Sequence, residues 1–475
     1  MFDLARFKPV YEREVVKSMR DGSVPGMSVL ITRNGETLYE RNFGSREWVG
    51  TKPATSDTLY GIASMTKSMT CVAILMLHEQ GKLNIDDPIS KYIPVKLQKD
   101  NIPITIHNLM SHSSGLPNLG SYGVSIRNED LTPFKGQNIP MGNWDDFYFY
   151  VNDAQDWLLH NPGEKFYYNN DGFTMLSQII AKVSHMSYED FLSENLLKPI
   201  GMNRSTFYRE DLESDENASK GYSSQPAKDG MKREPKPHLS SKFNSGAGGL
   251  NSSTAEMTKY LLFHLNNGKV GDKQLVSPEL LAKMYEPHNQ HVPTENFLLF
   301  SNPPAYGYGL SIVDDYHGYK LIRHGGASGV AGGIIILIPE LDITYTHLYN
   351  VGWFTMHLTH IALYSLLGMD PTEVPYLKRR AHYRTLQGEY VGYMKNIQGK
   401  VSLKSGLLYF ETEIVEKSSV PLIPVNPKET EPLTFYMYSP YGRLTVSFTI
   451  QADGSVTFDY ERNLMKKVDY RPELE

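Results

Sequence analysis

The stretch "GIASMTKSMTCVAILMLHEQGKL", residues 61–83, has the pattern of a long apolar helix. Gly81 is a natural stop, so we expect the helix to run from about Ser64 to Gly81. Ser64 and Lys67 are three residues apart, and residues at this spacing lie on one face of a helix. Leucine would pack better at both positions, so this polar pair is the first candidate for a reaction centre.

A serine hydroxyl attacks a carbonyl at neutral pH only with the help of a base. Lys67 is a candidate base, because a lysine that is partly desolvated in a cleft has a lowered pKa. The amino end of a helix also favours negative charge, first on an incipient alkoxide and then on a tetrahedral oxyanion at Ser64. Ser-x-x-Lys recurs by chance, however, so the motif alone leaves a solvated lysine as the more frequent outcome.

Residues 161–173, "NPGEKFYYNNDGF", contain a second candidate pair. Tyr168 and Asn170 alternate along a short extended or turn segment, so both side chains are expected to face one cleft. Tyr168 could take the serine proton as a phenolate or relay it, and Asn170 could hold a substrate amide or carbonyl. The alternative is a polar aromatic loop in which the asparagines cap backbone groups, the more frequent role of such residues.

Residues 321–329, "LIRHGGASG", contain a third candidate. A predicted strand ends at His324, and Gly325 and Gly326 follow. Glycines at this place would let a substrate lie against the strand edge, because no side chain shields the backbone. The alternative is a turn at the end of a strand with a surface histidine.

Residues 1–375 predict an α+β domain. Asn34-Gly35 predicts a hairpin near the amino terminus, and strand patterns return at 306–351, including "YGYGLSIVD" and the buried run "GGIIILIP". The economical assembly is one antiparallel sheet flanked by helices, with a helical subdomain inserted at about 84–300. Within that insertion, Ser253 and Glu256 predict a capping box.

Residues 380–475 predict a separate all-β domain. "GKVSLKSGLLYFETEI" and "GRLTVSFTIQADGSVTFDY" alternate in polarity and are broken by glycine and Asp-Gly turns. This pattern is typical of a small barrel or a curled sheet. The basic segment 376–384, "YLKRRAHYR", is the expected junction between the two domains.

Composition excludes several functions. The chain has 475 residues and a net charge of −6 without a concentrated basic stretch, so nucleic acid is not expected as a partner. The single cysteine, Cys71, has apolar neighbours that predict a buried thiol, and His288 and His291 lack a carboxylate partner for a metal site. No apolar run approaches the ~18–20 residues of a membrane helix, and the amino terminus resembles no secretion signal. We therefore expect a cytoplasmic protein without a membrane partner.

Taken together, the motifs Ser64-x-x-Lys67, Tyr168-x-Asn170 and His324-x-Gly326 resemble those of the penicillin-recognising serine hydrolases. That family includes class C β-lactamases, D-alanyl-D-alanine carboxypeptidases, D-aminopeptidases and esterases. The flanking stretches "EQGKLNIDDPISKYIP", "ITIHNLMSHSSGLP" and "GAGGLNSSTAEM" are also similar, and the resemblance spans about residues 15–370. It implies a β-lactamase/transpeptidase-like fold, a small-molecule or peptide substrate, an acyl-enzyme intermediate, and no metal or organic cofactor.

The resemblance also implies residue roles. Ser64 is the nucleophile, Lys67 and Tyr168 share general-base and general-acid duty, and the backbone N–H groups of Ser64 and Ala327 form the oxyanion hole. The catalytic residues that the resemblance implies are Ser64, Lys67, Tyr168 and His324. The substrate-binding residues that it implies are Asn170, Gly325, Gly326 and Ala327.

Two departures from the family pattern bear on the substrate. His324 stands where many members have lysine, and Ala327 stands where β-lactamases often have serine or threonine. The site thus lacks a permanent cation and a hydroxyl suited to a substrate carboxylate. This favours peptidase, D-aminopeptidase or esterase action on amide (including D-residue) or ester bonds. A non-catalytic penicillin-binding-like ligand sensor, and a carboxylesterase or weak β-lactamase, stay open as alternatives.

The carboxy-terminal domain resembles the lipocalin-like barrel that certain prokaryotic peptidases of this family carry. In those proteins the barrel helps to form oligomers. The resemblance therefore implies a homo-oligomer assembled through residues 380–475.

Overall fold

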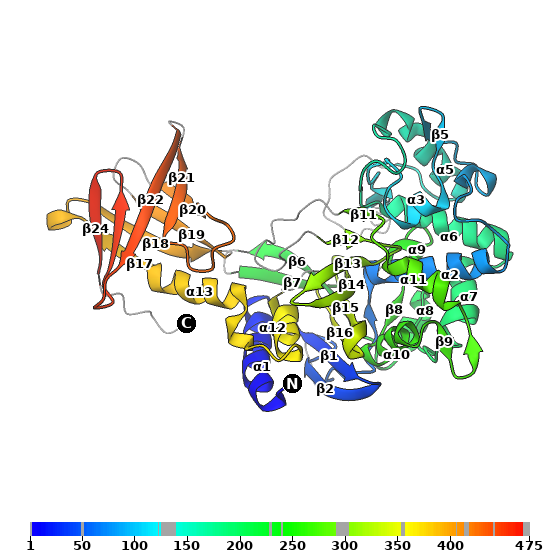
Figure 1. Cartoon of the computed structure of the whole chain (residues 1–475), viewed down its shortest axis with the longest axis horizontal. Coiled ribbons are helices and arrows are strands. Elements are labelled where there is room, and N and C mark those ends of the chain that lie inside the picture. The colour runs from blue at the N-terminus through cyan, green and yellow to red at the C-terminus, as the bar shows by residue number, and fades with distance from the viewer. Residues whose placement is uncertain are drawn as a thin grey trace. The chain divides into compact units, whose positions relative to one another are not determined.

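The structure of the protein, a computed structural model, has two compact units (Figure 1). The larger unit contains the described residues from 15 to 352, and the smaller unit contains residues 2–14 and those from 357 onward. The boundary expected at 375–380 stays a prediction. The structure describes residues 2–48, 52–121, 123–124, 139–227, 230–238, 241–290, 304–352, 357–404, 406–412, 418–439 and 442–468.

The larger unit is built on an antiparallel sheet with the strand order β11-β12-β13-β14-β15-β16-β1-β2. Its strands come from both ends of the unit, which confirms the predicted assembly. Asn34 and Gly35 form the predicted hairpin turn, with φ of 52° and 76°. The strands are β1 (Gly26–Arg33), β2 (Glu36–Gly44), β11 (Asn289–Gln290), β12 (Ala305–Tyr306), β13 (Ser311–Tyr316), β14 (Tyr319–Ala327), β15 (Gly332–Ile338) and β16 (Ile343–Tyr349).

The stretch "YGYGLSIVD", expected as one strand, is instead two strands separated by a turn. β12 ends at Tyr306 and β13 begins at Ser311. Gly309, in the turn, has a φ of 65°, and a Cβ there would lie 2.8 Å from the carbonyl oxygen of Lys67. The strand is interrupted because the chain must pass this close to a helix backbone.

Helices pack on the sheet and on one another. α10 crosses β1, β15 and β16, and α2 packs against α6 and α9. Cys71 of α2 is fully buried, as predicted, and burial raises the pKa of its thiol. The helices of this unit are α2 (Thr66–Glu79), α3 (Ile106–Met110), α5 (Trp144–Asn152), α6 (Asn170–Ser184), α7 (Tyr188–Leu192), α8 (Arg209–Ser214), α9 (Ser245–Gly248), α10 (Thr254–Leu265) and α11 (Pro278–Ala282).

Short two-stranded sheets join the connecting segments of the larger unit. β3 directly precedes the turn that leads into α2, and β8 pairs with it. The pairs are β3 (Tyr60–Gly61) with β8 (Asn251–Ser252), β4 (Gln98–Lys99) with β5 (Ile102–Pro103), β6 (Gly221–Ala227) with β7 (Gly230–Lys236), and β9 (Lys269–Val270) with β10 (Lys273–Gln274).

The smaller unit contains a closed antiparallel barrel, which confirms the predicted all-β domain. Side chains fill its interior, with the rings of Phe448 and Phe458 stacked 4.6 Å apart. The barrel strands are β17 (Gly388–Val391), β18 (Gln398–Lys404), β19 (Leu407–Thr412), β20 (Ser418–Pro424), β21 (Thr434–Ser439), β22 (Gly442–Ile450), β23 (Val456–Tyr460) and β24 (Asn463–Val468).

The expected junction at 376–384 lies within a helix, α13 (Pro375–Leu386), which follows α12 (His357–Leu366). Arg380 of α13 donates to both carboxylate oxygens of Glu14 at 2.7 Å, which ties α13 to α1 (Leu4–Asp21). Glu14 is buried, so this pair satisfies a charge that would otherwise be costly. None of the helices in the described ranges has the length and apolar character that a membrane crossing requires.

Candidate active site

Ser64 lies in a single 3-10 turn, Ala63–Met65, that leads directly into α2. The predicted helix is therefore present, but its first turn is wound more tightly than an α-helix. Ala63 has a φ of 48°, a left-handed conformation that costs an alanine roughly 1–2 kcal/mol. Such strain commonly accompanies a functional site. The sharp bend leaves the Ser64 side chain half-exposed at the start of the helix.

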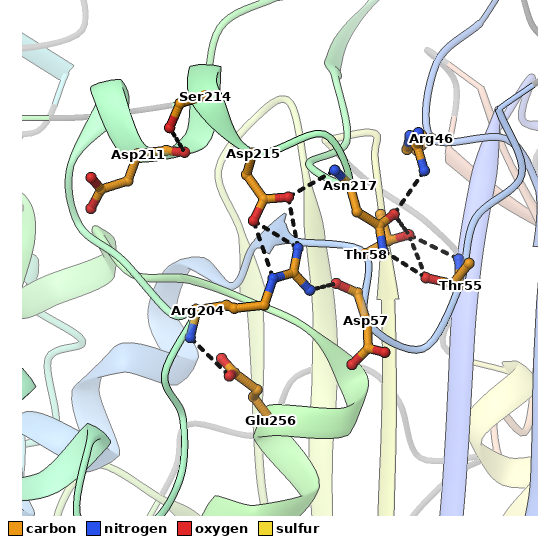
Figure 2. A network of polar contacts seen from close by, with 10 residues as sticks. All are labelled: Arg46, Thr55, Asp57, Thr58, Arg204, Asp211, Ser214, Asp215, Asn217 and Glu256. Carbon is orange, nitrogen blue, oxygen red and sulfur yellow. Dashed lines mark hydrogen bonds and ion pairs between the residues drawn. The ribbon is translucent and has the colours of Figure 1, made fainter.

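The chain that leads into this turn is held by a backbone contact and, further upstream, by the polar network drawn in Figure 2. Ile62 N donates to the carbonyl oxygen of Leu250, next to the β3–β8 pairing. Further upstream in the same segment, Arg46 and Thr58 each donate a hydrogen bond to the side-chain oxygen of Asn217. These contacts fix the backbone before residue 64 and so define the position of the nucleophile candidate.

Arg204 links the same segment to α10, as Figure 2 shows. Its guanidinium binds both oxygens of Asp215 at 2.7 Å and also donates to the carbonyl of Asp57. Its backbone N–H donates to the carboxylate of Glu256 at 2.9 Å. The predicted capping box is thus only half formed: Ser253 accepts from the N–H of Glu256, but the Glu256 carboxylate binds Arg204.

Lys67 is fully buried, and its Nζ lies 3.1 Å from Oγ of Ser64, as the helical spacing predicts. The same nitrogen donates to Oδ1 of Asn170 at 2.7 Å and to the carbonyl oxygen of Ala247 at 2.6 Å. Burial lowers the pKa of Lys67 to about 7, although the charge of Asp171 opposes the change. A large fraction of the amine is therefore neutral near pH 7.

Tyr168 and Asn170 both face Lys67, so the structure brings the second motif to the first. The Tyr168 ring centroid is 4.9 Å from Nζ of Lys67, and the Ser64 side chain partly offsets the effect of burial on the pKa of the phenol. Asn170 is the first residue of α6, after the N-cap Asn169. Burial raises the pKa of Tyr168, so this side chain is a neutral phenol at neutral pH.

The end of β14 passes directly over the Ser64 turn. β13 pairs with β14 only as far as Arg323, so the edge from His324 onward extends beyond β13. A Cβ at Gly326 would lie 2.1 Å from the carbonyl oxygen of Ile62 and 3.1 Å from N of Ser64. Only glycine allows this approach. Gly325 and Ala327, by contrast, are exposed.

His324 is buried, and both nitrogens of its ring are hydrogen-bonded within the protein. This excludes the surface histidine that the sequence left open. Its Nε2 lies 2.9 Å from the hydroxyl of Tyr306, and its Nδ1 donates to the carbonyl oxygen of Gly325 at 2.6 Å. Its ring centroid is 6.3 Å from that of Tyr168. The third motif therefore reaches the other two.

Two contributors to the site were not singled out from the sequence. The carbonyl oxygen of Ala247 accepts a hydrogen bond from Lys67. The neighbouring Gly248 is the sequence signal for this close approach, because a Cβ there would lie 3.2 Å from the carbonyl carbon of Ala63. Tyr306 binds His324 across 18 residues, and no local pattern marks it.

The described residues contain no cluster of three or more His, Cys, Asp or Glu side chains that suits a metal ion. His288 donates from Nε2 to the carbonyl of Lys283 at 2.9 Å and stacks on Tyr308. His291 lies outside the described residues.

An antiparallel sheet flanked by helices, with these three motifs at one site, defines a protein of the β-lactamase/transpeptidase fold class. The chain belongs to the β-lactamase family, whose model matches residues 12–353. A second model, the Pab87 octamerisation domain, matches residues 371–466.

Similar solved structures agree with this assignment. The octameric penicillin-binding protein homologue from Pyrococcus abyssi is 32% identical, covers 97% of this chain and 99% of its own, and superposes with a TM-score of 0.85. A class C β-lactamase is 19% identical, with a TM-score of 0.58 over 76% of this chain and 96% of its own. EstCE1, a hydrolase with promiscuous acyltransferase activity, is 19% identical, with a TM-score of 0.59 over 77% of this chain and 99% of its own. The last two show the fold alone.

Among characterised sequences, protein flp of Staphylococcus aureus (strain MW2) is 27% identical over 341 residues. The match covers 70% of this chain and 61% of that protein. The chain therefore spans less than two thirds of the length of this relative.

Proposed function

We propose that this protein is a serine hydrolase that forms an acyl-enzyme through Ser64 and cleaves amide or ester bonds. The substrates are peptides, including peptides with D-residues, or small esters.

The observation that carries the proposal is the hydrogen bonding of the Lys67 amine. A neutral amine has two N–H donors and one lone pair. Both acceptors around Nζ, Oδ1 of Asn170 and the carbonyl of Ala247, can only accept, so they take the two N–H groups. The lone pair is left for the Ser64 hydroxyl at 3.1 Å, which is the arrangement of a general base.

In the proposed reaction, Lys67 accepts the Ser64 proton while Oγ forms a bond to the substrate carbonyl carbon. The backbone N–H groups of Ser64 and Ala327 stabilise the oxyanion. The neutral phenol of Tyr168 passes the proton to the departing nitrogen or oxygen as the scissile bond breaks. Lys67 then takes a proton from water, which attacks the acyl carbon; the bond to Ser64 Oγ breaks, and Oγ takes the proton back from Lys67. Asn170 orients the amine throughout.

The third motif supports a substrate without a carboxylate at the β14 edge. The segment His324–Ala327 carries no side chain with a permanent charge, and the imidazole of His324 is buried with both ring nitrogens bonded. A carboxylate placed there would lose its water without gaining an ion pair. This favours D-aminopeptidase, peptidase or esterase action over β-lactamase or carboxypeptidase action.

We also propose that the chain forms a homo-oligomer through residues 371–466. The match to an octamerisation domain and the similarity to an octameric homologue support this assembly. Sedimentation equilibrium should give a mass that is a multiple of the 53.8 kDa chain. A purely monomeric protein would contradict it.

Covalent labelling tests the proposed activity. Intact mass should increase after treatment with a fluorophosphonate or a β-lactam, and the Ser64→Ala variant should remain unlabelled. Hydrolysis of nitrophenyl esters and D-aminoacyl anilides then separates esterase from aminopeptidase action. A protein that is neither labelled nor active on these substrates would instead be a non-catalytic ligand sensor.

A further inference from the structure

Tyr306 stands behind the third motif without touching the nucleophile. It lies at the end of β12, is 1% exposed, and places its hydroxyl 2.9 Å from Nε2 of His324. We propose that Tyr306 is a positioning residue: acting through His324, it holds the β14 backbone that presents the Ala327 N–H to the reaction. This inference rests on the proposed function, because that N–H is assigned there as an oxyanion donor.

The direction of each hydrogen bond follows from its partners. The carbonyl oxygen of Gly325 can only accept, so Nδ1 of His324 carries a proton. In the neutral imidazole Nε2 is then the acceptor, and the Tyr306 hydroxyl donates to it. Burial raises the pKa of Tyr306, so this donor stays protonated. The result is a relay from the Tyr306 hydroxyl through the imidazole to the backbone of Gly325.

The backbone at this end of β14 needs such support because few side chains hold it. Gly325 and Gly326 precede Ala327, and the facing residues of β15 opposite Gly326 and Ala327 are Gly333 and Gly332. Glycine backbones have the largest conformational freedom. Holding the Gly325 carbonyl in place restricts the orientation of the peptide planes that follow it. The Ala327 N–H belongs to one of these planes, two residues further along the chain.

A different role for Tyr306 would be packing alone. Its ring centroid lies 4.9 Å from that of His112 and 6.4 Å from that of Tyr168, inside an aromatic cluster. Packing depends on the ring and not on the hydroxyl. The variant Tyr306→Phe therefore separates the two roles, since it keeps the ring and removes only the donor.

The chain offers a matched control for this variant. Tyr308 is 2% exposed, and its hydroxyl lies 2.6 Å from Nδ1 of the half-buried His107, a second tyrosine–histidine pair. With a nitrophenyl ester, Tyr306→Phe should lower kcat about 10-fold, a part of the 10²–10³-fold loss when an oxyanion donor is removed outright. KM should stay within about twofold, and Tyr308→Phe should leave both constants within about twofold of wild type.

A double variant shows whether Tyr306 acts through His324. His324→Ala alone should lower kcat, and adding Tyr306→Phe should lower it by less than about twofold more. Independent, multiplicative effects would overturn the proposal, as would a Tyr306→Phe enzyme with wild-type kcat. Crystal structures of the wild type and of Tyr306→Phe give a readout without activity. The His324 ring should leave the Gly325 carbonyl in the variant, and an unchanged ring and β14 backbone would overturn the proposal.

The two hypotheses can fail separately. If Ser64 of the wild-type protein is not labelled and no substrate is turned over, the proposed function fails. The crystal structures still decide whether Tyr306 positions His324 and the β14 backbone.

Discussion

Lys67→Met removes the amine of the candidate active site while keeping a side chain of similar length in a fully buried position. If Lys67 is the general base, acylation of Ser64 should slow by roughly 10²–10⁴-fold. The same variant tests why the lysine can act as a base. The reasoning requires that burial holds the amine neutral, and this has a consequence for stability that is independent of any substrate.

The pKa of Lys67 is 10.5 in its ordinary state and about 7 in the folded protein. Between these two values the unfolded chain binds one proton more than the folded chain. Stability therefore rises with pH across this window. The full effect is about 5 kcal/mol at 1.36 kcal/mol for each pH unit, and about 2 kcal/mol of it falls between pH 7 and pH 9. Methionine does not titrate, so the free energy of unfolding of Lys67→Met relative to wild type should fall by about 2 kcal/mol over that interval.

Urea unfolding followed by tryptophan fluorescence measures this difference. Trp48, Trp144 and Trp157 lie in the larger unit, and the sequence has no tryptophan after residue 353, so the signal does not come from the barrel. Lys82→Met, at an exposed lysine, is the control, and its stability relative to wild type should be the same at both pH values. If the Lys67→Met difference is also independent of pH, the folded protein keeps Lys67 charged, and the argument for a neutral base is wrong.

Three other outcomes follow from the same geometry. Because Lys67 must be neutral to act, the rate of fluorophosphonate labelling should rise about tenfold for each pH unit below 7 and level off above it; a rate that is flat from pH 5 to 9 would contradict this. Gly326→Ala should lower the free energy of unfolding by about 3 kcal/mol and abolish labelling, because its Cβ would collide with backbone, whereas Gly325→Ala has room and should fold normally. Arg204→Met should cost about 2 kcal/mol in urea unfolding, and Arg20→Met, which breaks an exposed ion pair, should cost less than about 0.5 kcal/mol; equal losses would refute the role given to the partly buried Arg204 network.

Elements that depend on local preference could be predicted from the sequence. The hairpin at Asn34-Gly35 requires two residues with positive φ, and few other pairs supply them. The run Gly332–Ile338 is buried along its whole length, and a short apolar run of β-branched residues bounded by turn signals is typical of a buried strand. The strands after residue 388 alternate polar and apolar residues, which is also a local pattern, and so they predicted a barrel.

Other elements were predicted incompletely because distant contacts changed them. The strand "YGYGLSIVD" is broken at Gly309 by the backbone of α2, which lies some 240 residues earlier in the chain. Glu256 has the right spacing for a capping box, but Arg204 and Ser205 offer its carboxylate better partners. A local pattern does not reveal such competitors.

The sequence by itself determined that Ser64 and Lys67 share a helix face, because helical periodicity is a local property, and it determined which residue types the three motifs supply. Only the tertiary structure decided the chemistry at Lys67. Burial lowers the pKa of the amine, and the carbonyl of Ala247, 180 residues away in the chain, takes one of its hydrogens. Desolvation and hydrogen-bond partners depend on what surrounds a group in space, and no spacing along the chain specifies them.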